Sequence, residues 1–207
     1  MTSTPTAAPS LELTTPTTDH TGARDFDFLM GPWHIRNTRL MQRLTGCTEW
    51  ETFDATGYAR PLPGGIGNYD DFIASTWKPG YVGMSLRVFN PAAQRWSIYW
   101  LDNATGGVDA ATGLLQPPVV GGFADGKGIF NGRDVLGVRP ILVQFEWSLM
   151  HTGAPRWQQS FSADEGQTWE VNWVMEFTRR CDRHSSGVLV WGVSARPATV
   201  QASDWPR

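Results

Sequence analysis

Short runs in which apolar and polar residues alternate constrain this chain more than any other feature. The two clearest runs place Phe145, Trp147 and Leu149, and then Val171, Trp173, Met175 and Phe177, on one side. Side chains of a β-strand point alternately to opposite faces, so a period of two predicts strands with one apolar and one polar face. Such strands need a cover on the apolar face, which favours antiparallel sheets around a common interior.

Nine extended segments are expected, each bounded by residues typical of turns. They are residues 33–41, 49–58, 67–77, 82–89, 95–101, 121–130, 141–151, 156–162 and 168–178. The chain has 22 Gly and 14 Pro, which excludes a bundle of long helices, because both residues destabilise helix interiors. One-sided strands hide their apolar face and their edges when the sheet closes on itself. The predicted fold is all-β, an up-and-down antiparallel β-barrel of about nine to ten strands.

The two ends of the chain differ from the barrel segment. Residues 1–23 are rich in Thr, Pro, Ala and Ser with almost no large apolar side chains, so a disordered tail is expected. Residues 25–30 predict a short N-terminal helical plug, which Gly31 and Pro32 end. The barrel is expected in residues 24–180, and residues 181–207 form a C-terminal extension in which 187–193 has the composition of one extra strand.

The charge balance excludes several classes of partner. The chain has 17 Lys and Arg against 20 Asp and Glu, a formal net charge of −3, and no basic cluster longer than a pair. Nucleic acid is therefore not an expected partner. No segment approaches the roughly 20 apolar residues of a membrane-spanning helix, and the first residues lack the pattern of a secretion signal. We expect no membrane partner and a cytoplasmic location.

Metal and cofactor binding are not expected. Cys47 and Cys181 lie far apart in no metal-binding pattern, so they are interpreted as isolated thiols. The four histidines are His20, His34, His151 and His184. No two of them have the spacing of metal ligands on a helix or hairpin.

The start of the first strand carries a resemblance. Gly31-Pro32-Trp33 follows the helical segment and resembles the Gly-x-Trp signature of lipocalins and their calycin relatives. In that fold the Trp closes the barrel floor and an Arg of the last strand packs over its indole, a cation–π contact. The resemblance implies a structural role for Trp33, with Arg179 or Arg180 as its partner.

Over residues 26–180 the chain also resembles a bacterial family of lipocalin-like proteins carried as a domain of unknown function. The matching stretches are residues 26–33, 96–100 and 160–170, followed by Asn172-Trp173. This resemblance implies a calycin-like barrel and brings no catalytic residues. Barrels similar to nitrobindins bind haem through one His, and His184 lies near the corresponding end of the barrel. The glycine pattern of their first strand is missing after Trp33, so no haem is expected.

Residues 162–169 match an Asp-box, S-x-D-x-G-x-T-W, a pattern known from β-propeller blades. Asp164 is expected to accept hydrogen bonds from turn amides, Gly166 to adopt a positive φ, and Trp169 to pack beneath the hairpin. Propellers repeat the pattern in each blade, whereas this chain has one copy. The pattern therefore predicts a stabilised hairpin and not a glycosidase.

An aromatic chamber results if the apolar strand faces turn inward. The candidate ligand-binding residues are Trp100, Trp147, Trp173, Met175, Phe145, Gln159, Asn68, Asp70 and Arg87. Indoles stack on flat apolar molecules, and a few polar groups fix the orientation of the ligand. The direction of the Arg87 side chain is ambiguous, because Met84, Leu86 and Val88 share the opposite face of its strand. If those three apolar residues face inward, Arg87 faces solvent or a partner.

Three functions fit this chamber. The first is binding of a small apolar or aromatic molecule. The second is an enzyme, namely a lyase, isomerase or cyclase that uses a carboxylate and an arginine inside the barrel. The carboxylates considered are Asp70, Asp71, Glu146 and Glu170. The third is a homodimeric scaffold with a filled lumen, and its candidate interface aromatics are Trp50, Tyr99 and Phe89.

Overall fold

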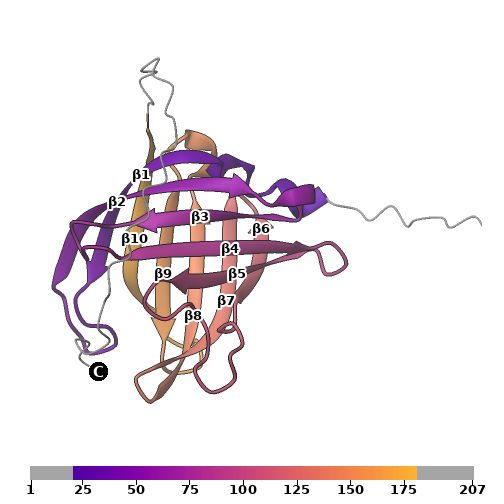
Figure 1. The fold of residues 1–207 in the computed structure, drawn as a ribbon. Coiled ribbons are helices and arrows are strands. Elements are labelled where there is room, and N and C mark those ends of the chain that lie inside the picture. Colours follow the sequence, from indigo (N-terminus) through magenta and orange to yellow (C-terminus); the bar gives the residue numbers. More distant parts are fainter. Residues whose placement is uncertain (1–20, 181–207) are drawn as a thin grey trace, which may run out of the picture.

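The computed structural model describes residues 21–180, which form one closed barrel (Figure 1). Its strands are β1 (Gly31–Leu40), β2 (Trp50–Pro61), β3 (Gly67–Ile73), β4 (Val82–Asn90), β5 (Arg95–Asp102), β6 (Val119–Ala124), β7 (Lys127–Leu136), β8 (Arg139–Ser148), β9 (Arg156–Ser162) and β10 (Glu170–Arg179). Each strand pairs antiparallel with its neighbours in sequence, and β1 pairs with β10 to close the ring. The predicted all-β, up-and-down barrel is confirmed.

One segment expected as a single strand, residues 121–130, is a hairpin. β6 ends at Ala124, β7 begins at Lys127, and Asp125 and Gly126 between them both have positive φ. A two-residue turn with positive φ at both positions matches the twist of the flanking strands, and Asp-Gly favours it. The nine expected segments therefore become ten strands.

Two other segments are shorter than expected. β3 ends at Ile73, so Trp77 lies in the loop that leads to β4. β8 ends at Ser148, and Leu149 then takes a φ of 57°. This left-handed residue starts a 3-10 helix, η4 (Met150–Thr152), and breaks the alternation. Leu149 is 50% exposed. The alternating pattern had predicted that it faces inward with Phe145, and that prediction is wrong.

The alternation in β10 is interrupted by a β-bulge. Val171 pairs with Ser160 and Trp173 pairs with Gln159, which leaves Asn172 as the extra residue. A bulge moves the residues before it to the opposite face. Val171 is therefore 36% exposed and Asn172 is fully buried, and the expectation that Val171 faces inward is wrong.

A plug closes one end of the barrel. It consists of two 3-10 helices, η1 (Thr21–Arg24) and η2 (Asp27–Leu29). The Phe26 side chain between them is 1% exposed, and its ring meets those of Trp96 and Phe123 edge-on at 4.9 Å. The helical plug is present but begins earlier than expected, since residues 21–23, assigned to the tail, belong to η1. Residues 1–20 and 181–207, with the expected strand at 187–193, lie outside the described residues.

Trp33 and Arg179 lock this plugged end. The Trp33 indole donates its N–H to the carbonyl of Leu29 at 2.5 Å. The Arg179 guanidinium lies 3.9 Å from the centroid of the Trp33 ring and donates to the carbonyls of Phe28 and Met30. Arg179, and not Arg180, takes this place because the β1–β10 register sets it opposite Trp33. The structural role predicted for Trp33 fits this geometry.

One seam in the wall is short. β5 pairs with β6 only through Trp96, Ser97 and Ile98, whereas its pairing with β4 extends from Arg95 to Asp102. Residues 103–118 connect β5 to β6 and contain one isolated bridge, between Val108 and Leu115. The second half of β5 therefore has a hydrogen-bonded strand on one side only.

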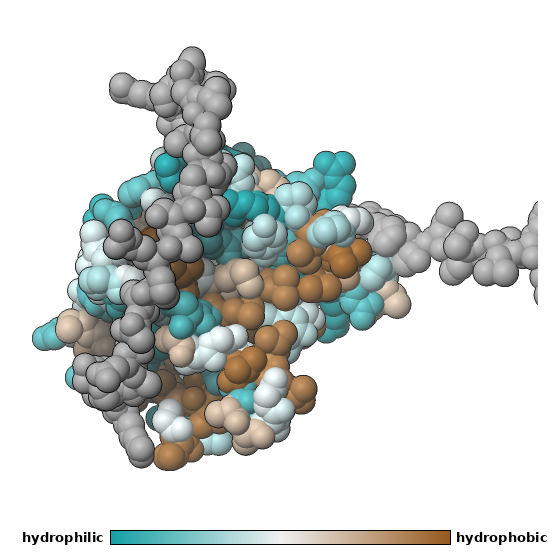
Figure 2. Space-filling view, in the orientation of Figure 1, coloured by the Kyte–Doolittle hydropathy of each residue, from teal (hydrophilic) through white to brown (hydrophobic). Residues whose placement is uncertain are grey.

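The outer surface of β3, β4 and β5 is unusually apolar. Its outward residues include Tyr69, Ile73, Val82, Met84, Leu86, Val88, Tyr99 and Leu101. The registers set Tyr69, Leu86 and Tyr99 side by side in one row. Figure 2 shows brown side chains gathered on this face. The outward side of β5 is thus half-buried or exposed.

Candidate functional site

The barrel interior contains a cavity of about 330 Å³. Inward residues of the strands form its walls, from Ile35 in β1 to Phe177 in β10. It reaches the end opposite the plug, where Arg43 of the β1–β2 loop and Gln116 and Arg133 also line it. This volume lies within the range of about 300–1,000 Å³ typical of small-molecule sites. The open lumen counts against the alternative of a filled barrel.

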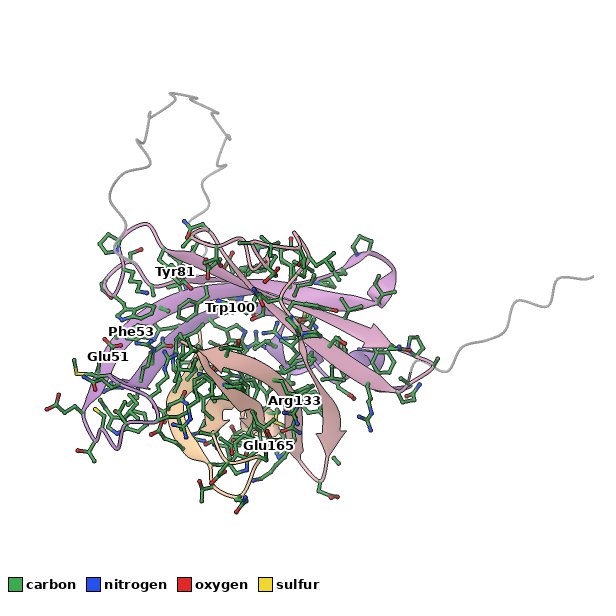
Figure 3. All side chains as sticks on the ribbon, turned by 90° about the horizontal axis from the view of Figure 1, so that it is seen from below. Glu51, Phe53, Tyr81, Trp100, Arg133 and Glu165 are labelled. Atoms are coloured by element: carbon green, nitrogen blue, oxygen red, sulfur yellow. The ribbon has the colours of Figure 1, made fainter. Side chains whose placement is uncertain are left out.

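Aromatic rings hold one another in place around the cavity. Trp157 lies 4.9 Å from Phe145 and 6.2 Å from Trp173, both edge to face. Phe72 meets Trp100 at 6.0 Å and Trp173 at 6.2 Å in the same manner. Such edge-to-face pairs are the preferred contacts of aromatic side chains. The wall is therefore a set of mutually supported rings. Seen from below, Trp100 lies between Phe53 on one side and Arg133 on the other (Figure 3).

A glycine makes room for the Trp100 ring. Gly83 stands in β4 beside the end of β5, and a Cβ added there would lie 2.4 Å from the Trp100 indole. No carbon atom fits at that distance without displacing the ring. The position of Trp100 in the cavity wall thus depends on the absence of a side chain at residue 83.

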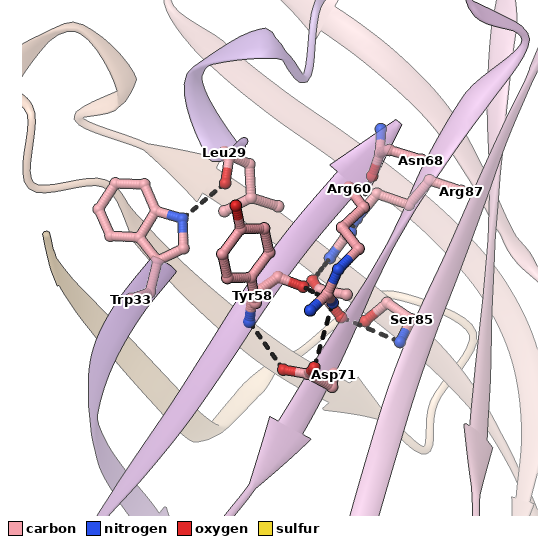
Figure 4. A network of polar contacts seen from close by, with 9 residues as sticks. Leu29, Trp33, Tyr58, Arg60, Asn68, Asp71, Ser85 and Arg87 are labelled. Carbon is pink, nitrogen blue, oxygen red and sulfur yellow. Dashed lines mark hydrogen bonds and ion pairs between the residues drawn. The ribbon is translucent and has the colours of Figure 1, made fainter. Parts of the chain in front are cut away.

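A buried ion pair occupies the cavity floor next to the plug. Arg87 donates from Nη2 to Oδ2 of Asp70 at 2.6 Å and from Nη1 to Oδ1 of Asn68 at 3.0 Å (Figure 4). The other oxygen of Asp70 accepts the backbone N–H of Ser85 at 3.0 Å. The Arg87 guanidinium also lies 5.2 Å from the Phe26 ring centroid. The pair therefore connects the cavity to the plug.

The interpretation that turned Arg87 toward solvent is wrong. Its side chain is only 4% exposed. Met84, Leu86 and Val88 do occupy the opposite face of β4, but that apolar face is the outer one. The prediction that Arg87 lies on the face opposite to these three residues is correct. The assumption that the apolar face of the strand points inward is wrong.

Most of the candidate ligand-binding residues meet at the cavity. The lining includes Trp100, Trp147, Trp173, Met175, Phe145, Gln159, Asp70 and Arg87. Asn68 is 3% exposed and does not line the cavity, so its part is to hold Arg87. The binding role of these residues stays a prediction.

Several lining residues were missed by the sequence analysis. Phe72 follows Asp70 by two positions in β3, so the alternation itself was a usable signal. Phe161 follows Gln159 in β9 in the same way. Arg43 lies in a loop, where no periodicity indicates direction. Arg133 belongs to the half of β7 beyond the expected strand.

Two buried donors in cavity residues lack a partner in the described part of the chain. They are Nε of Arg87 and Nε1 of Trp147. The guanidinium carbon of Arg87 lies 6.0 Å from the centroid of the Trp147 ring, so both donors belong to the floor. An unpaired buried donor is unfavourable by about 1–3 kcal/mol. The floor therefore favours an acceptor atom on any molecule that reaches it.

The four carboxylates considered for acid–base chemistry do not converge. Asp70 is bound to Arg87 in the cavity, and Asp71 pairs with Arg60 at 3.2 Å (Figure 4). Glu146 pairs with Lys127 at 2.9 Å on the outer face. Glu170 accepts the backbone N–H of Leu44 at 2.8 Å. No specific contact in the described residues favours the enzyme alternative.

The Asp-box forms a turn between β9 and β10. Asp164 accepts the hydroxyl of Thr168 at 2.6 Å, the backbone N–H of Thr168 at 2.9 Å, and the hydroxyl of Ser162 at 2.8 Å. These hydrogen bonds, that from the Thr168 hydroxyl first, lower the pKa of Asp164 to about 2. Gly166 has a φ of +87°, as expected. Trp169 is 38% exposed, so it covers the hairpin only in part.

The interface aromatics fall into two groups. Trp50 is 43% exposed, and Tyr99 lies half-buried on the outer face of β5. Phe89 is 4% exposed and packs on Trp96 at 5.3 Å inside the barrel, so it does not belong to an interface. The homodimer stays a prediction.

Metal-binding clusters and membrane spans were also sought in residues 21–180. No group of three or more His, Cys, Asp or Glu side chains in this range could hold a metal ion. Cys47 is a half-buried free thiol. No helix in the same range has the length and apolar content needed to cross a bilayer. His20, His184 and Cys181 lie outside the described residues.

The fold and the site together define a closed ten-stranded β-barrel with one plugged end and an aromatic cavity. A scan of the chain against protein-family models finds no match, and a search of curated proteins finds none either. The resemblance to lipocalin-like proteins therefore stays a prediction.

Proposed function

We propose that this barrel binds a small molecule with a flat, largely apolar body in its interior. The observation that carries the proposal is the cavity of about 330 Å³ walled by Trp100, Trp147, Trp157 and Trp173. Apolar pockets with a few polar groups are the usual form of small-molecule sites. Indole walls favour planar ligands, because rings stack or meet edge to face with them.

The polar floor supports an oriented ligand. Arg87 and Asp70 neutralise each other, and the two unpaired donors, Nε of Arg87 and Nε1 of Trp147, belong to the same floor. The remaining inward side chains are mainly aromatic or aliphatic, with Gln159 as a polar exception that is bound to Asn172 at 2.8 Å. A ligand thus enters with its apolar part among the indoles.

The test is a titration with N-phenyl-1-naphthylamine, a neutral aromatic probe whose fluorescence rises in apolar surroundings. We expect saturable binding with quenching of tryptophan emission. Trp100→Ala removes one ring of the wall, and about 1 kcal/mol of ring contact corresponds to about five-fold weaker binding. Trp50→Ala removes an exposed indole outside the cavity and serves as the matched control. Absence of saturable binding, or equal effects of both substitutions, would contradict the proposal.

A further inference from the structure

Arg43 lies at the cavity mouth and has no ion-pair partner among residues 21–180. It belongs to the β1–β2 loop and lines the cavity. Its guanidinium lies 5.7 Å from the ring centroid of Phe161, an inward residue that is 5% exposed. No carboxylate of the described residues lies within 4.0 Å of its nitrogens. The cation therefore lies over the apolar wall, and no carboxylate of residues 21–180 engages its N–H donors.

The other two arginines of the cavity differ in this respect. Arg87 pairs with Asp70 at 2.6 Å on the floor. Arg133 pairs with Glu165 at 2.9 Å at the rim. Arg43 is thus the arginine of this lining whose charge has no direct counterion in the described chain.

The charges around Arg43 are committed to other groups. Glu51 accepts Nη1 of Arg39 at 2.7 Å and the indole N–H of Trp77 at 3.1 Å. Glu170 accepts the backbone N–H of Leu44. Partial burial, and then the nearby Arg39 charge, lower the pKa of Arg43 to about 10, while the charges of Glu51 and Glu170 act in the opposite direction without forming an ion pair with it. The guanidinium remains protonated at neutral pH, and among residues 21–180 no carboxylate is in direct contact with it.

We infer that the ligand is an organic anion whose apolar body occupies the barrel and whose carboxylate, sulfonate or phosphate oxygens accept hydrogen bonds from Arg43 at the mouth. This inference rests on the proposed function. A guanidinium presents a planar fork of donors that matches two oxygens of such a group. The mouth also suits a charge better than the floor does, because the charged group stays near water.

The floor is a poorer site for the anion. The Arg87 charge is already matched by Asp70, and a further negative charge there would be buried without a counterion. The ligand therefore points its charge outward, and its opposite end reaches the indoles near the plug.

Two fluorescent probes of nearly the same shape test the inference. 8-Anilinonaphthalene-1-sulfonate carries a sulfonate, and N-phenyl-1-naphthylamine is the same ring system without it. We expect the wild-type chain to bind the sulfonate probe more tightly, and Arg43→Gln to weaken its binding about ten-fold, while binding of the neutral probe changes less than about two-fold. Arg43→Lys, which keeps the charge and loses the fork, should fall between. Rising salt should weaken sulfonate binding in the wild type more than in Arg43→Gln.

The matched control is Arg36→Gln, which removes an exposed arginine on the outer face of β1. Displacement of the neutral probe by the sulfonate probe reports that both bind one site, and weaker binding of the neutral probe to Trp100→Ala assigns that site to the cavity and not to the apolar face of β3–β5. The inference is overturned if Arg43→Gln leaves sulfonate binding unchanged or weakens both probes equally. The proposed function itself fails in a different way, namely when neither probe binds saturably to the wild-type chain.

Discussion

The two ends of this barrel are built differently from the same sheet. At the plugged end Phe26 is 1% exposed, and the donors of Trp33 and Arg179 reach backbone carbonyls of the plug. At the open end Arg43 forms no ion pair with any residue of the described range, and Trp169 is 38% exposed. Satisfied and buried groups stabilise a fold, whereas unsatisfied groups at a cavity mouth favour a ligand. The comparison assigns most of the stabilising contacts to the plug, and the groups proposed to recognise a ligand to the cavity between the floor and the mouth.

The largest expected effect is that of Phe26→Ala at the plugged end. It removes a ring that contacts Trp96 and Phe123, and loss of a buried Phe typically lowers the free energy of unfolding by about 3–5 kcal/mol. Urea denaturation measures the change. Trp169→Ala at the open end should lower it by less than about 1 kcal/mol. Equal decreases in the free energy of unfolding for Phe26→Ala and Trp169→Ala would contradict the stated difference between the two ends.

Gly83→Ala tests the wall between the two ends. The new Cβ would meet the Trp100 ring at 2.4 Å, and overpacking typically lowers stability by about 1–3 kcal/mol. Displacement of the indole should also weaken binding of the neutral probe. Gly122→Ala is the matched control, since a Cβ there has no atom within 4 Å. The prediction fails if both variants bind and unfold alike.

Arg179→Ala sharpens the account of the plugged end. It removes the cation over Trp33 and the donors to Phe28 and Met30. Because Arg179 is exposed, we expect a loss of about 1–2 kcal/mol in the free energy of unfolding, measured by denaturation. Arg180→Ala, whose side chain makes no such contact, should change little. A larger decrease in the free energy of unfolding for Arg180→Ala than for Arg179→Ala would contradict the assignment of these contacts to Arg179.

Asp164 gives the smallest effect, at the open end. Its pKa is lowered from 3.8 to about 2, so its stabilising contribution is present above pH 4 and is lost as pH falls through about 2. The difference in unfolding free energy between wild type and Asp164→Ala should therefore shrink between pH 5 and pH 2. A difference that stays constant over this range would contradict the assigned hydrogen bonds.

The sequence predicted the barrel because each strand carries its own alternation. Trp100, Trp147 and Trp173 were assigned to the interior from period alone, and the structure places them around the cavity. The extra strand was missed because Asp125 and Gly126 were included within one extended segment. The bulge at Asn172 was missed because a bulge depends on pairing with β9, which no local pattern reveals.

Arg87 and Arg43 illustrate two different limits. In β4 the apolar face lies outside, since the inner face is set by Gly83 under Trp100 and by the pair of Arg87 with Asp70. Apolar residues are common on protein surfaces, so an apolar face does not by itself point inward. Arg43 lies in a loop, and its place over Phe161 depends on how distant strands meet.

The short seam between β5 and β6 has a consequence for capacity. Only three residues of β5 pair with β6, and the rest of β5 has no strand partner on that side. Residues 103–118 connect the two strands. Spreading the wall at this seam breaks fewer backbone hydrogen bonds than at β4–β5, where the pairing is longer. If the barrel binds a ligand as proposed, a larger ligand would therefore part the wall most easily at this seam, while the longer pairings keep their register. The segment 103–118 also supplies Gln116 and Pro117 to the lining, so it borders the cavity at the place where the wall has the fewest backbone hydrogen bonds.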